Sequence, residues 1–135
     1  RQLLPRRAGG VTLNLPLVGA LSTAHVSMTA SPGEHGYGSE VDMLRGLPGA
    51  DRWLWRDGEG GLSEAMVRFA VRHEALSVED VLARRCRLLF LDAAEAQRQA
   101  GAVATILAEE LGAGFDAAAS QAAFEALAAQ YQRLP

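Results

Sequence analysis

The sequence predicts an all-α protein, an antiparallel bundle of four or five helices that follows an extended, loop-rich N-terminal segment. Two observations lead to this prediction. Alanine and arginine favour helices and are abundant, whereas β-branched residues are scarce. Most of the glycines and prolines precede residue 62, so loops are expected in the first part of the chain. A length of 135 residues indicates a single folded domain.

The N-terminal segment has only weak regular patterns. Apolar and polar residues alternate over residues 11–17, which is weakly typical of a strand. Pro16 restricts this stretch to an edge strand or an extended linker, because proline cannot donate to a sheet. Glycine, proline and serine then indicate loops within residues 31–38.

One short helix is expected before residue 62. Ser39 can cap its start and Gly46 can end it, which places the helix over residues 39–45. Trp53 and Trp55 follow in a stretch rich in glycine and aspartate. We expect a loop there that both indole rings anchor to a hydrophobic surface.

The second part of the chain has helical periodicity and clear start signals. Ser63 can cap a helix over residues 64–75. Ser77 and Asp80 have the spacing of a capping box, which predicts a new helix that runs to Leu91.

Two further helices are predicted after that. Asp92 repeats the start signal, Gly101 is expected to bend or split the helix that follows, and Gly112 can end it. Asp116 can cap the last helix. Short turns between these helices favour antiparallel packing.

Charge, cysteine content and hydropathy exclude several classes of protein. The net charge of −3 argues against general nucleic-acid binding, which needs a basic surface. Cys86 is the single cysteine, so no internal disulfide can form and a reducing cytoplasm is expected. No apolar run reaches the roughly 20 residues of a membrane helix. The chain starts at Arg1 without methionine or a signal peptide, and we expect a piece of a longer protein or a chain whose first residues are unseen.

Sequence motifs predict no catalytic, cofactor-binding or metal-binding residue. The glycine-rich stretch 33–38 lacks a preceding buried strand and the Gly-x-Gly-x-x-Gly spacing, so a loop is favoured over a phosphate cradle. His73 and Glu74 begin like a zinc-protease helix, but Ser77 stands where the second histidine would be needed. No nucleophile elbow is present.

Cys86 lies between two arginines, which could lower the pKa of its thiol. Immediate neighbours on a helix point in different directions, however. We therefore favour a buried, inert thiol.

The residue of greatest interest is Arg85. At 100° per residue, Arg85 falls in the middle of the apolar face of residues 78–91 and should be buried. Glu74 or Glu64 could pair with it, and replacing Arg85 by methionine would then cost about 3 kcal/mol. An internal salt bridge, a contact with another domain and direct ligand binding remain open as its role.

The same projection places His73 among apolar residues of the preceding helix. It also places Asp80 and Arg84 together as an exposed i,i+4 pair, with Arg87 on the same side. The residues expected to have structural or interdomain roles are Arg85, Glu74, His73, Asp80, Arg84 and Arg87.

The run from Ala70 to Asp92 resembles the C-terminal domain of FAD-dependent glycerol-3-phosphate dehydrogenases and oxidases. The family run reads approximately V-E-D-x-L-A-R-R-T-R and is followed by F-L-D. Residues 78–85, Arg87 and residues 90–92 match it. Cys86 departs from the usual threonine, and Gly101 departs from the frequent proline.

The resemblance implies that this chain is one part of a longer parent enzyme and that another part binds FAD. Residues 1–36 would link to a preceding FAD-binding domain, and residues 37–135 would form a non-catalytic helical cap. The parent would oxidise glycerol 3-phosphate to dihydroxyacetone phosphate through FAD and pass electrons to a quinone, or to oxygen in the oxidases. A homodimer and a peripheral association of the parent with the cytoplasmic face of the inner membrane are compatible with the resemblance. The alternative is a free-standing helical protein-interaction module.

Overall fold

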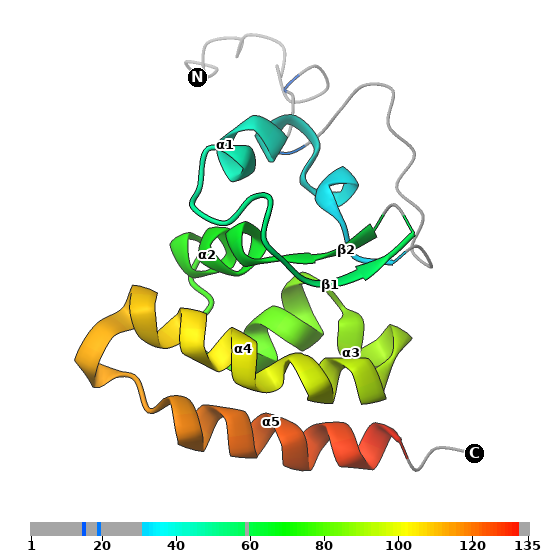
Figure 1. Cartoon of the computed structure of the whole chain (residues 1–135), viewed down its shortest axis with the longest axis vertical. Coiled ribbons are helices and arrows are strands. Elements are labelled where there is room, and N and C mark those ends of the chain that lie inside the picture. Colours follow the sequence, from blue (N-terminus) through cyan, green and yellow to red (C-terminus); the bar gives the residue numbers. More distant parts are fainter. Residues whose placement is uncertain (1–14, 16–18, 20–30, 59, 133–135) are drawn as a thin grey trace, which may run out of the picture.

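The structure is a computed structural model that describes residue 15, residue 19, residues 31–58 and residues 60–132 (Figure 1). The elements in chain order are η2 (Glu34–Glu40), α1 (Val41–Arg45), β1 (Trp53–Asp57), β2 (Gly60–Ser63), α2 (Glu64–Arg72), η3 (Asp80–Arg85), α3 (Leu88–Leu91), α4 (Ala93–Leu111), η4 (Gly112–Gly114) and α5 (Ala117–Tyr131). Of these, η2 and η4 are 3₁₀ helices and η3 is a π-helix. The prediction of a mainly helical protein is therefore confirmed.

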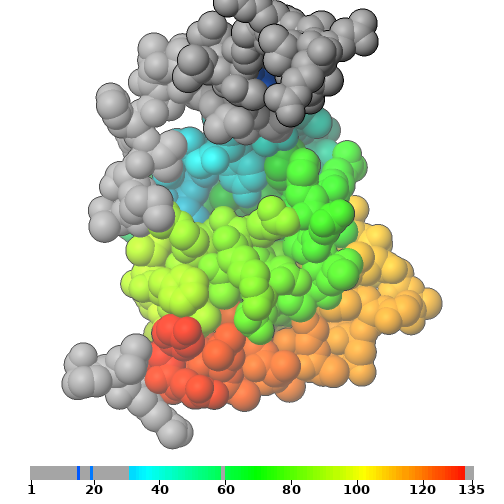
Figure 2. Space-filling view, turned by 180° about the vertical axis from the view of Figure 1, so that it is seen from behind, coloured from blue at the N-terminus to red at the C-terminus, as the bar shows by residue number. Residues whose placement is uncertain are grey.

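The longest helices form the layers of a bundle. In Figure 1, α4 and α5 lie side by side and run in opposite directions, while α2 packs on the other side of α4. Figure 2 shows α5, coloured orange to red, at one end of the described part, with η2 in cyan toward the other end. One hydrophobic core connects these elements, and its largest fully buried side chains include Phe124, Leu82 and Leu107.

All four predicted caps after residue 62, which are Ser63, Ser77, Asp92 and Asp116, accept the expected hydrogen bond. Ser63, Asp92 and Asp116 each accept a hydrogen bond from the backbone N–H three residues further on, at 3.3, 2.8 and 2.9 Å respectively. Such bonds satisfy donors that have no partner inside the helix. The starts of α2, α4 and α5 are therefore fixed by local chemistry that can be read from the sequence.

Trp53 and Trp55 lie in a β-hairpin, which corrects the predicted loop. They belong to β1, which pairs antiparallel with β2. Gly61 has φ of 148°, and a Cβ there would lie 2.4 Å from the Trp55 carbonyl oxygen, so only glycine fits. The Gly61 N–H also donates to the Pro32 carbonyl oxygen at 2.6 Å. Trp55 packs against the core as expected, whereas Trp53 is not among the residues that pack against it and instead lies under the Arg56 guanidinium.

The expected helix over residues 39–45 is shorter than predicted. Ser39 lies inside η2 and does not cap α1, which begins at Val41 after Glu40. The predicted stop at Gly46 is confirmed. The 3₁₀ helix occupies most of the expected loop at residues 31–38.

The predicted strand over residues 11–17 lies outside the described residues, apart from Leu15, which is exposed.

The predicted helix from Ser77 to Leu91 is divided into two helices. In η3 the Cys86 N–H donates to the Val81 carbonyl oxygen five residues earlier, at 3.0 Å. Arg87 then has φ of 59°, a left-handed conformation that ends the turn before α3 starts. A five-residue hydrogen-bond spacing widens the turn, so an α-helical projection misplaces side chains in this segment.

Gly101 does not bend or split α4, which is continuous from Ala93 to Leu111. A Cβ at Gly101 would lie 3.4 Å from the side-chain nitrogen of Gln121 in α5. The glycine therefore lies where α4 and α5 approach each other, and the flexible end of Gln121 can adjust.

Two glycine-to-alanine substitutions should have opposite effects on stability. Gly101→Ala should raise the free energy of unfolding by about 0.5 to 1 kcal/mol, because alanine favours the helix interior. Gly112→Ala should lower it by about 1 kcal/mol or more, because φ of 74° with ψ of −160° is restricted to glycine. Urea denaturation of both variants measures these changes, and equal effects of the same sign would contradict the assignment.

Candidate functional site

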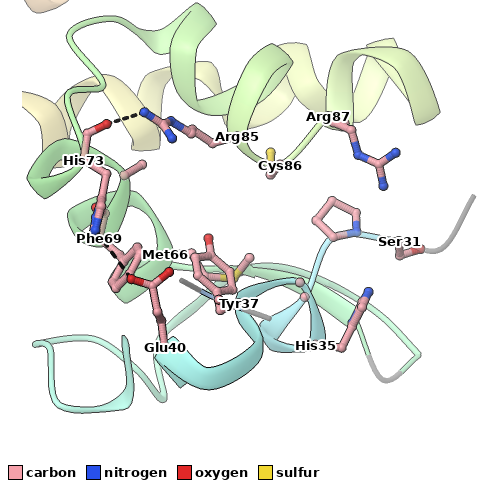
Figure 3. Close-up of a pocket in the computed structure, with 15 residues that line it drawn as sticks. Ser31, His35, Tyr37, Glu40, Met66, Phe69, His73, Arg85, Cys86 and Arg87 are labelled. Carbon is pink, nitrogen blue, oxygen red and sulfur yellow. Dashed lines mark hydrogen bonds and ion pairs between the residues drawn. The ribbon is translucent and has the colours of Figure 1, made fainter. Parts of the chain in front are cut away.

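A surface pocket of about 450 Å³ opens between three segments that are distant in sequence. They are the stretch from Ser31 to Glu40, α2 from Met66 onward with His73 at its end, and the end of η3 with the turn after it (Figure 3). The described residues that line it are Gly19, Ser31, Pro32, Gly33, His35, Gly36, Tyr37, Glu40, Met66, Phe69, Ala70, His73, Arg85, Cys86 and Arg87. This volume is within the range of small-molecule sites.

Aromatic rings form one wall of the pocket. The Phe69 ring meets the Tyr37 ring edge to face at 5.2 Å between centroids, and it stacks on the His73 ring at 4.2 Å. Nδ1 of His73 lies 2.9 Å from the Phe69 carbonyl oxygen, so this nitrogen carries a proton. Nε2 of His73 lies 3.8 Å from a Glu40 carboxylate oxygen. His73 therefore joins α2 to η2, and its predicted contact with apolar residues is confirmed.

Arg85 is exposed and does not pair with Glu74, so the prediction of a buried salt bridge is wrong. Its guanidinium donates to the backbone carbonyl oxygen of His73, as the dashed line in Figure 3 shows. Glu74 is itself exposed, with a left-handed φ of 69°. The reason is the π-helical turn, which moves Arg85 off the apolar face. Because Arg85 forms no buried ion pair, the stability loss predicted for Arg85→Met is no longer expected.

Asp80 and Arg84 form the predicted i,i+4 pair, with 2.8 Å between the guanidinium and the carboxylate. Arg84 also pairs with Glu79 at 2.7 Å. The Asp80 carboxylate accepts hydrogen bonds from the Ser77 hydroxyl at 2.8 Å and the Leu76 N–H at 3.1 Å. Ser77 in turn accepts from the Asp80 N–H, so the predicted capping pair is confirmed. This cluster lies outside the pocket lining.

These contacts control the titration of Asp80. Partial burial alone would raise the pKa of its carboxyl, but hydrogen bonds from Ser77 and Leu76 and the charge of Arg84 outweigh it and lower the pKa. A carboxyl with a lowered folded-state pKa stabilises the fold above its unfolded pKa, near 3.9.

The stabilisation by Asp80 should disappear as the pH falls through its folded-state pKa, below about 3.9. Asp80→Asn should lower the free energy of unfolding at pH 7 and reduce its change between pH 5 and pH 2. Urea denaturation at several pH values measures both quantities. A variant with the same pH dependence as the parent chain would contradict this role.

Two titratable side chains of the pocket are kept protonated. Burial raises the pKa of the Cys86 thiol to about 11, and the thiol donates to the Leu82 carbonyl oxygen at 3.7 Å. The predicted burial of Cys86 is thus confirmed. Burial also raises the pKa of Tyr37, so its hydroxyl stays a hydrogen-bond donor. Arg87 lines the pocket and is half-buried.

Among the described residues the buried cation is Arg68, which the sequence analysis missed. Arg68 is 8% exposed and pairs with Glu64 on its own helix and with Glu109 and Glu110 of α4, the latter two at 2.6 and 2.5 Å. Arg52 also pairs with Glu64, at 2.8 Å. The i,i+4 spacing of Glu64 and Arg68 is a local signal that could have indicated this pair.

The described part of the chain lacks both a cluster of metal ligands and a helix suited to span a membrane. Among the described side chains, no group of three histidines, cysteines, aspartates or glutamates is placed to hold a metal ion. None of the helices in the described ranges combines the length and the apolar character that crossing a bilayer requires.

The fold and the pocket define a small helical domain with one core and an open, partly cationic cavity at its surface. Residues 10–119 match the family of the C-terminal domain of alpha-glycerophosphate oxidase, and the chain belongs to this family. It is therefore a C-terminal domain of an FAD-dependent oxidase family, as the resemblance indicated. The match begins at residue 10 and therefore includes part of the segment that the sequence analysis assigned to a linker. Neither the curated proteins nor the solved structures contained a match to the chain.

Proposed function

We propose that the chain is the non-catalytic C-terminal domain of an aerobic glycerol-3-phosphate dehydrogenase. The parent would oxidise glycerol 3-phosphate to dihydroxyacetone phosphate and pass the electrons through FAD to a quinone. The observation that carries this proposal is the family match over residues 10–119. The reaction is proposed for the whole parent enzyme, which we place in the cytoplasm.

The FAD is assigned to a separate domain because this chain offers no dinucleotide cradle in its described part. The glycine-rich stretch 33–38 belongs largely to the 3₁₀ helix η2, and no strand precedes it among the described residues. A dinucleotide fingerprint needs a buried strand, a tight glycine turn and a helix whose N-terminus faces the pyrophosphate. The residues present do not fit such a group.

In this proposal the chain packs against the FAD-binding domain of the same polypeptide. Residues 1–36 would form the connection and residues 37–135 the cap. Exposed Arg85 remains available for a contact with that domain, because its guanidinium uses a backbone carbonyl and no carboxylate of the described residues. A homodimer is a further proposal for the parent.

The 135-residue chain alone should bind no flavin and should not oxidise glycerol 3-phosphate, because its described residues form neither a dinucleotide cradle nor a catalytic constellation. The full reading frame that encodes it should yield a yellow protein that reduces a quinone analogue when glycerol 3-phosphate is added. Absorbance near 450 nm after gel filtration measures bound flavin, and the rate of quinone reduction measures activity. The full-length protein should retain on the order of one flavin per chain, and the 135-residue chain should retain none.

Oxygen uptake with formation of hydrogen peroxide would show that the parent is an oxidase and not a quinone-dependent dehydrogenase. Flavin that stays with the isolated chain would overturn the non-catalytic assignment. A reading frame without a flavin-binding domain would instead favour a free-standing interaction module.

A further inference from the structure

The pocket keeps hydrogen-bond donors that the described part of the chain does not use. Tyr37 makes a ring contact with Phe69, but its hydroxyl has no hydrogen-bond partner among the described residues. Figure 3 shows this hydroxyl directed into the space between η2 and the end of η3. Arg85 uses one of its nitrogens for the His73 carbonyl, whereas a guanidinium has five N–H donors. Two unlike donors thus remain available in one cavity.

Positive charge dominates the described lining. Arg85 and Arg87 lie along one side of the pocket, and Glu40 is the only carboxylate among the described residues that line it. Glu40 is directed to His73, with 3.8 Å between the two side chains. Arg85 also acts electrostatically on Tyr37, because its charge lowers the pKa of that phenol against the larger effect of burial. The free donors and the charge of Arg85 both favour a negatively charged ligand.

The floor of the pocket is apolar. Met66, Phe69 and Ala70 belong to α2 and carry no polar side-chain atom other than sulfur. These three side chains are at most 7% exposed, so they present a small apolar surface, against which an organic anion, unlike inorganic phosphate, can place an apolar body. A volume of about 450 Å³ accommodates such a molecule.

We propose that the pocket binds a small organic anion, a carboxylate or a phosphate monoester, whose charged group is held by Arg85 and the Tyr37 hydroxyl. The apolar body lies against Met66, Phe69 and Ala70. The glycine-rich stretch thereby gains a role, because Gly33 and Gly36 line the cavity without side chains. The inference does not rest on the proposed function, and its failure would leave the flavin experiment unaffected.

Isothermal titration of the 135-residue chain tests the proposal with two anionic probes, phenyl phosphate and benzoate, and with neutral benzamide. At least one anion should bind, and benzamide should bind at least about tenfold more weakly. Arg85→Gln should weaken anion binding by about tenfold, and Tyr37→Phe should weaken it by about threefold or more, since it removes only the hydroxyl. The ratio of the two anion affinities distinguishes a phosphate ligand from a carboxylate ligand.

Arg84→Gln is the matched control, because Arg84 lies next to Arg85 but is held by Glu79 and Asp80 outside the pocket. This variant should bind the anion as the parent chain does. Thermal melts of all variants show whether each is folded. Absence of anion binding, or equal losses in the Arg84 and Arg85 variants, would overturn the proposal. The proposal would also be overturned if Arg85→Gln weakened only the association between domains of the full-length protein. The pocket would then be a contact site for a neighbouring domain.

Discussion

Replacing Arg68 by methionine should lower the free energy of unfolding by about 3 kcal/mol. Arg68 is buried, and its guanidinium is the shared partner of Glu64, Glu109 and Glu110. Methionine preserves most of the side-chain length but leaves three carboxylates close together without their central cation. Arg52 still pairs with Glu64, which keeps the loss at the lower end of the range for a broken buried pair. Urea denaturation measures the effect.

Arg84→Met provides a matched control for this experiment. Arg84 also pairs with two carboxylates, Glu79 and Asp80, but its side chain is 59% exposed. Solvent screens such pairs, and the loss should be about 1 kcal/mol or less. Similar losses in the two variants would show that burial does not distinguish the two clusters.

Replacing Phe124 by alanine should lower the free energy of unfolding by about 3 to 5 kcal/mol. Phe124 is 1% exposed and is the largest of the fully buried side chains. It anchors α5, whose main neighbour is α4. The substitution removes a buried ring and leaves a cavity between helices that are already closely packed. The midpoint of urea denaturation, with far-UV circular dichroism as the probe, reports the loss.

Phe90→Ala is the corresponding control, because Phe90 is 59% exposed and meets Tyr131 edge to face at 5.6 Å. Loss of that ring contact should cost about 1 kcal/mol or less. An equal loss for Phe124 and Phe90 would contradict the position of the core.

Helix starts were predictable because capping is local. Ser63, Ser77, Asp92 and Asp116 each act within three residues of their own position, and no distant residue is needed to recognise them. The ends at Gly46 and Gly112 were predictable for the same reason. The hairpin was not, because glycines in β2 suggest a loop until their pairing with β1 is known.

Side-chain positions depended on the kind of helix. Asp80 and Arg84 were placed correctly, because long flexible side chains four residues apart can still meet in a π-helical turn. Arg85 was misplaced because its predicted burial depended on the α-helical projection, which does not hold in η3. Burial of Arg68 depends on Glu109 and Glu110, more than 40 residues away, so periodicity within α2 alone could not reveal it.

The pocket could not be predicted because no single segment contains it. Tyr37, Phe69 and Arg85 come from three elements that meet only in the folded protein. Sequence analysis did single out the glycine-rich stretch and Arg85, with ligand binding as one of three alternatives for the arginine. Only the folded structure shows that the glycine-rich stretch and Arg85 lie next to each other.

The hydrogen bond between Gly61 and Pro32 bears on the resistance of the protein to aggregation. A two-stranded sheet has open edges at which the backbone of another chain can add and begin a fibril. Here the Gly61 N–H is already bound to the Pro32 carbonyl at 2.6 Å, and proline has no N–H with which to extend the ladder. The residues immediately before η2 thus protect one edge of the hairpin against recruitment by a second chain.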